Sequence, residues 1–333
     1  MNFNAIVGNP PYQLMDGGAQ SSSTPIYNLF VDASKKIKPD YVSLIMPSRW
    51  MTGGKGLDDF RSSMIHDKSI RILHDYYDEK DCFNNVDIKG GVCYFLWDKS
   101  YKQECDVYTH SSNGEIKHSK RFLAVNDEAT FFVRDAELVD VLGRVSSKHL
   151  KTFDSMVSSR KPYGLTGDFF KDPSKYKLPK ISDTKIDGGI SILGLGEKQK
   201  RIHKYVGADY PFPKKDGLDE IKVFIPESFG SGTMGEGPTS PVIAGKNCAC
   251  TETFLEIRPV DSKETAENIV AYMRTKFFRV LVGVAKNTQH GTQKVYSLVP
   301  VVDFKKKWTD EELFEFFGLS ESQRAYINDL IAE

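Results

Sequence analysis

Apolar and polar positions alternate with a regular rhythm over the first hundred residues. The short apolar run at Asn4–Gly8 predicts a buried strand, and apolar residues spaced three and four apart in Pro25–Ile37 predict a helix. The same two patterns recur, with strands expected at Tyr41–Met46, Ile70–Leu73 and Gly91–Trp97 and a helix at Leu57–Ile65. Strands that alternate with helices indicate an α/β fold whose sheet has substantial parallel pairing.

From about residue 105 the pattern becomes less regular. Short strand-like runs separated by loops rich in Gly, Pro and Lys occur at Glu115–His118, Ala129–Arg134, Ile221–Ile225 and Phe254–Ile257. Helical periodicity returns at Glu264–Val284 and at Asp310–Ile331. We therefore expect two domains, an α/β domain at 1–104 and an α+β domain at 105–333.

Composition narrows the class of protein. The chain has 333 residues, 40% hydrophobic and 27% charged, which is typical of a folded globular protein. No apolar run approaches the roughly 18 residues of a membrane span, and the first residues lack the features of a signal peptide. The five cysteines predict reduced thiols and a cytoplasmic location. Cys248 and Cys250 form a C-x-C pair with no second pair or nearby His, so we expect no metal.

The balance of charge leaves nucleic-acid binding open. Lys plus Arg equal Asp plus Glu at 45 each, yet residues 151–210 hold 12 basic against 7 acidic side chains. A local positive face, and not the total, is what a nucleic-acid partner requires.

The sequence Asn9-Pro10-Pro11-Tyr12 directly follows the first predicted strand. In an open α/β sheet, side chains beyond the carboxyl end of a strand project into the ligand crevice. An Asn side-chain oxygen and a backbone carbonyl are two acceptors that can bind both hydrogens of an amino group such as adenine N6. Proline holds the backbone, and an aromatic ring can stack on a base flipped from a duplex. Asn and Pro are also common turn residues, so the alternative is a simple turn.

This motif resembles that of the Eco57I-like restriction–modification methylases, which modify adenine N6. The resemblance covers nearly the whole chain, through Ser43–Trp50, Asp81–Phe83, Lys89–Trp97, Cys250–Leu255 and Lys286–His290. It implies the C-terminal half of a Rossmann-like methyltransferase sheet, followed by an α+β target-recognition domain that binds double-stranded DNA. It also implies that Asn9 and the carbonyl of Pro10 accept from the adenine amino group and that Tyr12 stacks on the flipped base. Pro47 and Trp50 would shape the pocket or border the donor site, although a strand terminator and a core aromatic fit equally well.

The family takes its methyl group from S-adenosylmethionine, bound by an upstream half with an F-x-G-x-G turn. The chain starts four residues before the first strand, so we expect a partner subunit or a further segment to supply that half. The alternative within the chain is Glu227–Gly235, which superficially looks like the donor motif. Two prolines follow it, and a donor turn needs a helix after it, so a loop is favoured.

The second region holds basic and amide side chains suited to phosphates and base edges. The candidates are Arg160, Lys161, Lys200, Arg201, Lys286, Asn287, Gln289 and His290. An ordinary solvated loop is the alternative for the last four. No carboxylate–histidine cluster is recognisable around His290, which argues against a catalytic or metal-binding role for that residue.

Two other functions remain as alternatives. The chain could be a non-enzymatic DNA-specificity subunit or an inactive fragment, which would bind DNA without methyl transfer. The E-x-K pattern of Glu220–Lys222 would suit an endonuclease, but no preceding acidic residue lies in a convincing nuclease strand.

Overall fold

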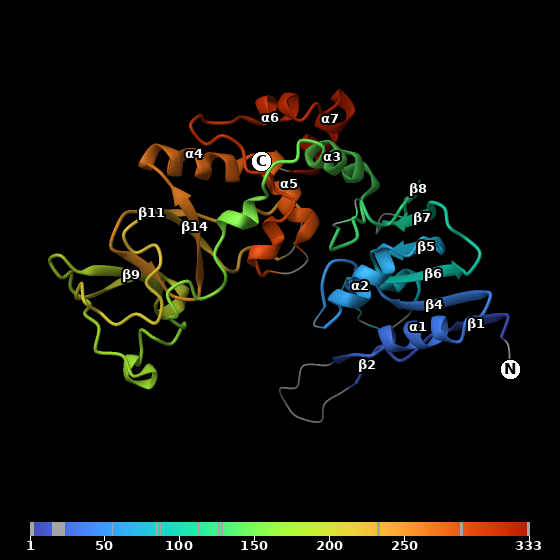
Figure 1. The fold of residues 1–333 in the computed structure, drawn as a ribbon, viewed down its shortest axis with the longest axis horizontal. Coiled ribbons are helices and arrows are strands. Elements are labelled where there is room, and N and C mark those ends of the chain that lie inside the picture. Colours follow the sequence, from blue (N-terminus) through green and yellow to red (C-terminus); the bar gives the residue numbers. More distant parts are fainter. Residues whose placement is uncertain are drawn as a thin grey trace. The chain divides into compact units, whose positions relative to one another are not determined.

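The computed structural model describes residues 3–14, 24–54, 56–83, 86, 88, 90–111, 114–125, 127, 129–231, 234–286 and 289–331. The chain divides into two compact units, Met1–Gly143 (unit 1) and Arg144–Glu333 (unit 2). Figure 1 shows both, and each is described by itself.

Unit 1 is built on a mixed six-stranded sheet in the order β1-β4-β6-β5-β7-β8. Strands β1 and β4 pair in parallel, as do β5 and β7, whereas β6 and β8 run antiparallel to their neighbours. The strands are β1 (Ala5–Gly8), β4 (Tyr41–Pro47), β5 (Ile70–Tyr76), β6 (Val92–Asp98), β7 (Cys105–His110) and β8 (Ile116–Arg121). The α/β class is confirmed: β1, β4, β5 and β7 run in one direction, β6 is inserted antiparallel between β4 and β5, and β8 is antiparallel at the edge.

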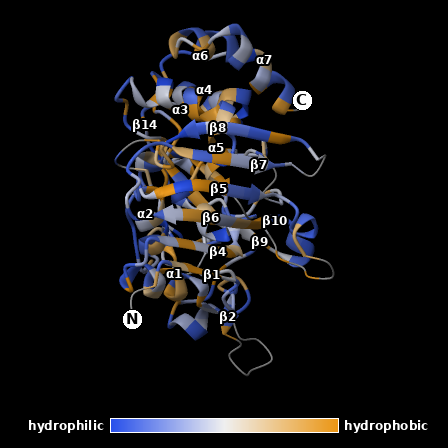
Figure 2. Ribbon diagram, turned by 90° about the vertical axis from the view of Figure 1, so that its right-hand side faces the viewer, coloured by the Kyte–Doolittle hydropathy of each residue, from blue (hydrophilic) through white to orange (hydrophobic). Residues whose placement is uncertain are grey.

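The two faces of this sheet differ. The core is formed where α1 (Tyr27–Lys36) and α2 (Asp58–Ile65) bury apolar side chains such as Val31 and Phe60 with Met46 and Phe95. Strand residues alternate between faces, so Leu73 is buried while its neighbour His74 is half-buried. Figure 2 shows the strands of this sheet side by side.

Unit 1 extends past the boundary expected at 104/105. Strand β7 pairs with β5 over Asp106–His110, so the segment after residue 104 completes the sheet of unit 1. The expected strand Ala129–Arg134 is wrong, since these residues have no regular structure; Phe132 N–H donates to Met51 O at 2.7 Å. The helix α3 (Ala136–Ser146) then spans the junction between the units.

Among its described residues, unit 2 contains two three-stranded sheets and the helices α4 to α7. One sheet has the order β10-β9-β13 and the other β12-β11-β14. Their strands are β9 (Ile190–Leu195), β10 (Arg201–Val206), β11 (Ile221–Pro226), β12 (Val242–Ala244), β13 (Cys248–Cys250) and β14 (Phe254–Val260). The helices are α4 (Lys263–Arg274), α5 (Lys276–Ala285), α6 (Asp310–Phe316) and α7 (Glu321–Leu330).

Two long helices expected in this unit are each divided in the structure. Thr275 ends α4 with an extended backbone (ψ 150°) and caps α5, its hydroxyl accepting from Phe278 N–H. Gly318 follows α6 in a left-handed conformation (φ 65°), and Ser320 caps α7 in a capping box with Gln323. Glycine after a helix and Ser three residues before Gln are both helix-end signals, so the second break was readable from sequence.

Short 3-10 turns occur in both units. They are η1 (Ser48–Met51), η2 (Glu79–Asp81), η3 (Phe153–Met156), η4 (Pro173–Tyr176), η5 (Glu197–Gln199) and η6 (Gln293–Tyr296).

Among the described residues, no helix has both the length and the apolar character that crossing a membrane requires. All five cysteines are free thiols.

Candidate active site and nucleic-acid interface

The Asn9–Tyr12 motif begins one residue beyond the carboxyl end of β1. Gly8 is in register with Leu44 of the parallel strand β4, which ends at Pro47, so both strand ends lie at the same edge of the sheet. Pro10 is buried, whereas Asn9 and Pro11 are exposed. The chain is then fastened by Ile26 N–H, which donates to Tyr12 O at 3.1 Å, and by the short pair β2 (Gln13–Leu14) and β3 (Thr24–Pro25). The buried ring of Pro10 therefore fixes the backbone next to the exposed side-chain amide of Asn9.

The Tyr12 ring is half-buried and packs against the core of unit 1. Burial raises the pKa of Tyr12 to about 12, and the nearby thiols of Cys93 and Cys82 add to the rise. The Asn9 side chain acts on this pKa in the opposite direction, although the buried Tyr12 hydroxyl has no hydrogen-bond partner among the described residues. The Asn9 and Tyr12 side chains therefore lie together, and the phenol is neutral at pH 7.

Pro47 and Trp50 are both buried, which fits the alternative roles of strand terminator and core aromatic. Pro47 is buried at the end of β4. Trp50 has no exposed surface; its indole N–H contacts Cys93 Sγ at 3.3 Å and its ring meets Phe60 edge-on at 5.8 Å. Trp50 is thus a core aromatic. It can support a pocket only by packing beneath the residues that line it.

A buried charged network, which the sequence reading missed, ties the strand ends together. Asp75 has no exposed surface and receives two bonds from Arg134, Nε–Oδ2 at 2.6 Å and Nη2–Oδ1 at 2.8 Å. Ser48 Oγ donates to Asp75 Oδ1 at 2.7 Å, and Ser48 N–H donates to Gly91 O at 2.9 Å. The signal for this network was an Asp inside an apolar strand, because a buried carboxylate requires a partner.

Gly91 is needed at this junction. Its φ is +83°, and a side-chain carbon there would lie 2.0 Å from Tyr76 O. The start of β6 can therefore approach the end of β5 only with glycine at this position.

In unit 2, Arg160 and Lys161 share one acidic partner. Arg160 Nη2 and Lys161 Nζ each lie 3.4 Å from Glu252 Oε2. Both basic side chains remain largely exposed, at 60% and 44%, so they form a surface pair that a phosphate can still reach.

Arg201 and Lys200 are neighbours with different surroundings. The guanidinium of Arg201 donates to Ser240 O and, at 2.9 Å, to Thr239 O, and it lies over the Phe254 ring. Lys200 is exposed. Arg201 therefore holds β10 to the loop before β12, although Arg201, like Lys200, is exposed.

The structure corrects the prediction for Lys286, whose side chain is only 1% exposed. Its ammonium lies 3.1 Å from Glu236 Oε2 and 4.6 Å from the centre of the Phe229 ring. A cation enclosed in this way cannot reach a phosphate. Asn287 lies outside the described residues.

Gln289 and His290 are exposed, as a DNA contact requires. His290 nevertheless has an acidic partner that the sequence did not reveal, since its Nδ1 lies 3.1 Å from Glu227 Oε1 and 3.2 Å from Ser228 Oγ. Glu227 and Ser228 are the first two residues of Glu227–Gly235, the alternative donor motif expected from the sequence. No helix begins in residues 234–241, so the requirement for a following helix is not met there.

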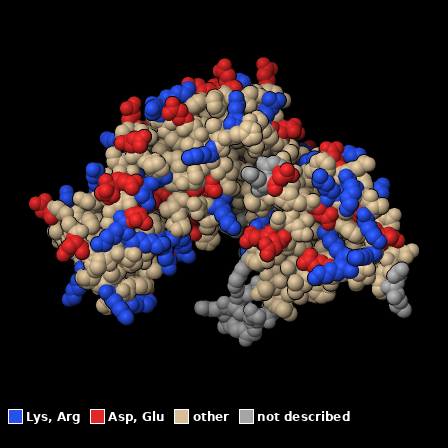
Figure 3. Space-filling view, viewed as in Figure 1, with Lys and Arg blue, Asp and Glu red and all other residues tan. Residues whose placement is uncertain are grey.

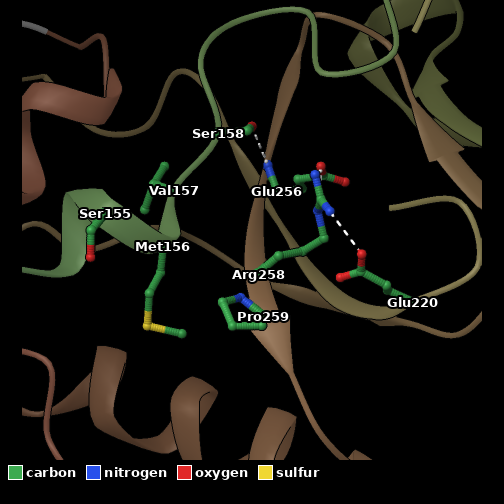
Figure 4. Close-up of a pocket in the computed structure, with 8 residues that line it drawn as sticks. All are labelled: Ser155, Met156, Val157, Ser158, Glu220, Glu256, Arg258 and Pro259. Atoms are coloured by element: carbon green, nitrogen blue, oxygen red, sulfur yellow. Dashed lines mark hydrogen bonds and ion pairs between the residues drawn. The ribbon is translucent and has the colours of Figure 1, made fainter. Parts of the chain in front are cut away.

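A pocket of about 390 Å³ lies beside β11 and β14 (Figure 4). Its charged lining is Glu220, Glu256 and Arg258, with Arg258 bonded to Glu220 at 3.1 Å and to Glu256 at 2.8 Å. Lys222 has no exposed surface, and its ammonium donates to backbone carbonyls, including Cys248 O at 3.0 Å. Since burial also lowers the pKa of Lys222, the E-x-K pattern lacks the accessible lysine that an endonuclease site uses.

Among the described residues, no three His, Cys, Asp or Glu side chains converge as a metal ion would require. Figure 3 shows basic and acidic side chains interspersed, with Lys and Arg frequent over the part of unit 2 that contains β9.

The N-terminal region matches the model of a known protein family. Residues 1–83 match the model of the Eco57I restriction-modification methylase family. The resemblance to this family is confirmed there. The matched region contains Asn9–Tyr12, Pro47 and Trp50, whereas the similarity expected for the later motifs stays a prediction.

A curated relative points the same way. An uncharacterized adenine-specific methylase of Mycoplasma pneumoniae is 35% identical over 133 residues, which is 38% of this chain and 32% of that protein. This chain therefore aligns with about a third of the length of that relative.

Solved structures are similar at a greater distance. The type IIL restriction-modification enzyme MmeI in complex with DNA is 12% identical, with 88% of this chain and 46% of that chain covered and a TM-score of 0.45. The type IIG restriction endonuclease BpuSI is also 12% identical, with 98% and 54% covered and a TM-score of 0.38. The fold assignment accordingly rests on the strand order of this chain.

Proposed function

We propose that this chain is the adenine-binding and DNA-recognition part of a restriction–modification DNA methyltransferase that modifies adenine N6. The observation that carries the proposal is Asn9-Pro10-Pro11-Tyr12, which lies at the carboxyl edge of the parallel pair β1–β4 inside the region that matches the Eco57I family. The adenine-specific relative supports the choice of base.

The chemistry follows from the acceptors at this edge. The exposed Asn9 amide oxygen and the Pro10 carbonyl would each accept one hydrogen of the adenine amino group. Two acceptors draw the nitrogen toward a tetrahedral geometry, which localises its lone pair and favours the transition state over the planar ground state. Tyr12, held beside Asn9 and neutral at pH 7, would stack on the base once it has left the duplex.

The methyl donor in this proposal is S-adenosylmethionine, which supplies an electrophilic methyl group. The glycine-rich alternative, Glu227–Gly235, lies partly outside the described residues, and no helix begins in residues 234–241 after it. We therefore propose that a donor-binding half joins the site from elsewhere, as a partner subunit or as a further segment.

The open edge of β1 is where we place that half. β1 pairs with β4 on one side, and no described strand pairs with its other side. Apolar side chains are exposed on or next to β1 and α1, namely Phe3 (49%), Val7 (77%), Leu29 (58%) and Ile37 (51%). An unpaired strand edge beside exposed apolar residues is a ready site for strand addition.

Unit 2 would bind the double-stranded DNA. Arg201 and Lys286 are assigned to internal contacts. The accessible candidates that remain are Arg160, Lys161, Lys200, Gln289 and His290. Phosphate contacts would position the duplex, and amide side chains would read base edges.

The test is a methylation assay on mixed-sequence duplex DNA with radiolabelled S-adenosylmethionine. The chain is assayed alone and together with a protein or segment that carries a strand ending in F-x-G-x-G. We expect transfer to adenine N6 only in the combined reaction. DNA binding without transfer in that reaction would favour the non-enzymatic specificity subunit or an inactive fragment.

A further inference from the structure

The strands β9 and β10 form a hairpin whose tip is a three-residue loop. The ladder pairs Ile190–Leu195 with Arg201–Val206, and Gly196 N–H closes it by donating to Lys200 O at 2.8 Å. The residues beyond this closing bond are Glu197, Lys198 and Gln199. β13 pairs with β9 at Ser191–Leu193, and Ser182 pairs with Tyr205 on the outer edge of β10, so the base of the hairpin is covered on both sides and only its tip projects.

The backbone at the tip is strained for the residues it contains. Lys198 (φ 53°) and Gln199 (φ 58°) are consecutive left-handed residues, and neither is glycine. Each such residue costs roughly 1–2 kcal/mol, and tight hairpins that need two positive φ angles usually contain Asn-Gly. The chain thus keeps two long polar side chains where the backbone favours small residues, a pattern that points to function.

The side chains of Lys198, Gln199 and Lys200 at the hairpin tip are exposed. Within the described part of the chain, Lys198, Gln199 and Lys200 make no side-chain hydrogen bond or ion pair. The base of the hairpin is firmly held, by contrast. Lys204 Nζ lies 2.9 Å from Asp183 Oδ1, and a side-chain carbon on Gly194 would lie 2.5 Å from the Phe170 ring. A rigid base therefore supports a tip that is free to bind.

We propose that this hairpin enters the major groove of DNA and that Gln199 reads a base edge there. The inference rests on the DNA-binding role proposed above and names the residue that sets specificity. Two strands about 4.8 Å apart are narrower than the roughly 12 Å major groove, so the tip beyond Gly196 can enter it while the base of the hairpin stays paired with β13 and Ser182. A glutamine amide can bind adenine N6 and N7 together, while Lys198 and Lys200 on either side reach the phosphates.

The experiment uses the full chain and selection of binding sites from a pool of random duplex DNA. The key variant is Gln199→Gly, which removes the amide, leaves the charge unchanged and suits the left-handed backbone. We expect wild type to enrich a motif and Gln199→Gly to lose preference at one or two positions. Its affinity ratio between selected and scrambled duplexes should fall about 5- to 150-fold, the range of one bidentate base contact. Its thermal midpoint should be equal to or above that of wild type.

Lys177→Gly is the matched control, since Lys177 is also an exposed left-handed residue (φ 57°) but lies after η4, outside the hairpin. This variant should enrich the wild-type motif. If Gln199→Gly enriches the wild-type motif with the same discrimination, the assignment of Gln199 is overturned while the DNA-binding role stands. If wild type binds duplex DNA at low salt but enriches no motif, the reading role of the hairpin is overturned. If wild type does not bind DNA at all, the proposed function of unit 2 fails with it.

Discussion

The candidate adenine site of unit 1 and the candidate DNA surface of unit 2 are assembled in different ways. Asn9, Pro10 and Tyr12 are neighbours in sequence, and a single strand end brings them to one edge. The basic candidates of unit 2 come from separate segments, and each has its own surroundings. A motif of consecutive residues keeps its geometry wherever the strand ends, whereas a dispersed surface depends on how every segment packs.

The consequence is clearest for the cations of unit 2. Arg201 and Lys286 resemble their neighbours in sequence, yet one binds two backbone carbonyls and the other is enclosed beside Glu236. Charge counts treat all lysines and arginines as equal, although burial and pairing decide which of them can meet a phosphate.

The largest effect is expected at Asn9, which tests whether unit 1 performs chemistry. In the reconstituted enzyme, Asn9→Ala should reduce methylation to background while duplex affinity stays near wild type. The lost acceptor acts on the reacting nitrogen, so the loss appears in kcat. Single-turnover methyl transfer and DNA binding measured on the same sample separate the two effects. Methylation at the wild-type rate would leave the motif as a turn only.

The next effect concerns the stability of unit 1. Asp75→Ala leaves the guanidinium of Arg134 without its carboxylate, which should cost about 3–5 kcal/mol of unfolding free energy. Denaturant unfolding of the full chain measures this. The double variant with Arg134→Met should lose less than the two single variants together, because it removes both charges. Additive losses would show that the two side chains act independently.

Tyr12 should show an intermediate effect. Tyr12→Ala is expected to weaken capture of the flipped base by ~1–3 kcal/mol, whereas Tyr12→Phe should keep most of the activity because the ring face makes the contact. The measurement is kcat/KM for methylation of duplex DNA by the reconstituted enzyme. Equal losses for both variants would assign the role to the hydroxyl.

A smaller effect separates the two kinds of cation in unit 2. Lys200→Ala should reduce the slope of log affinity against log salt by about 0.9 if Lys200 contacts one phosphate. Lys286→Met should leave this slope unchanged and lower the thermal midpoint, since its ammonium is paired inside the protein. Duplex affinity at four salt concentrations checks both. An unchanged slope for Lys200→Ala and a reduced slope for Lys286→Met would instead assign the phosphate contact to Lys286.

The smallest effect is a pH dependence of unit 1. His74 Nδ1 and His110 Nε2 lie 3.0 Å apart, and burial lowers the pKa of both, with His110 lowering that of His74 further. The unfolded chain then binds more protons than the folded chain below about pH 6.5, so the stability from these groups is present above that pH and is lost as pH falls. Unfolding between pH 7.5 and 5.5 should show this decline. The double variant His74→Phe, His110→Phe should flatten it, and an unchanged decline in that variant would contradict the assignment to these two side chains.

Much of unit 1 was predictable because its patterns are local. The strands at residues 5–8, 41–47 and 92–98 and both helices follow the apolar periodicity, although the first strand is largely exposed and not buried as its apolar run predicted. The strand β7 was missed because its alternating polar side chains look like a loop until β5 and β8 pair with it. In unit 2 the break at Thr275 was missed, since Thr within a helical pattern caps a new helix only where tertiary packing bends the chain there.

The sequence by itself determined the Asn9–Tyr12 motif, the α/β class and the resemblance of residues 1–83 to the Eco57I family, since each depends on residues that are neighbours along the chain. Only the tertiary structure decided that Trp50 belongs to the core, that Asp75 meets Arg134 and that Lys286 is enclosed. These are contacts between residues far apart in sequence. Their free energies depend on burial and pairing, which exist only after the chain has packed.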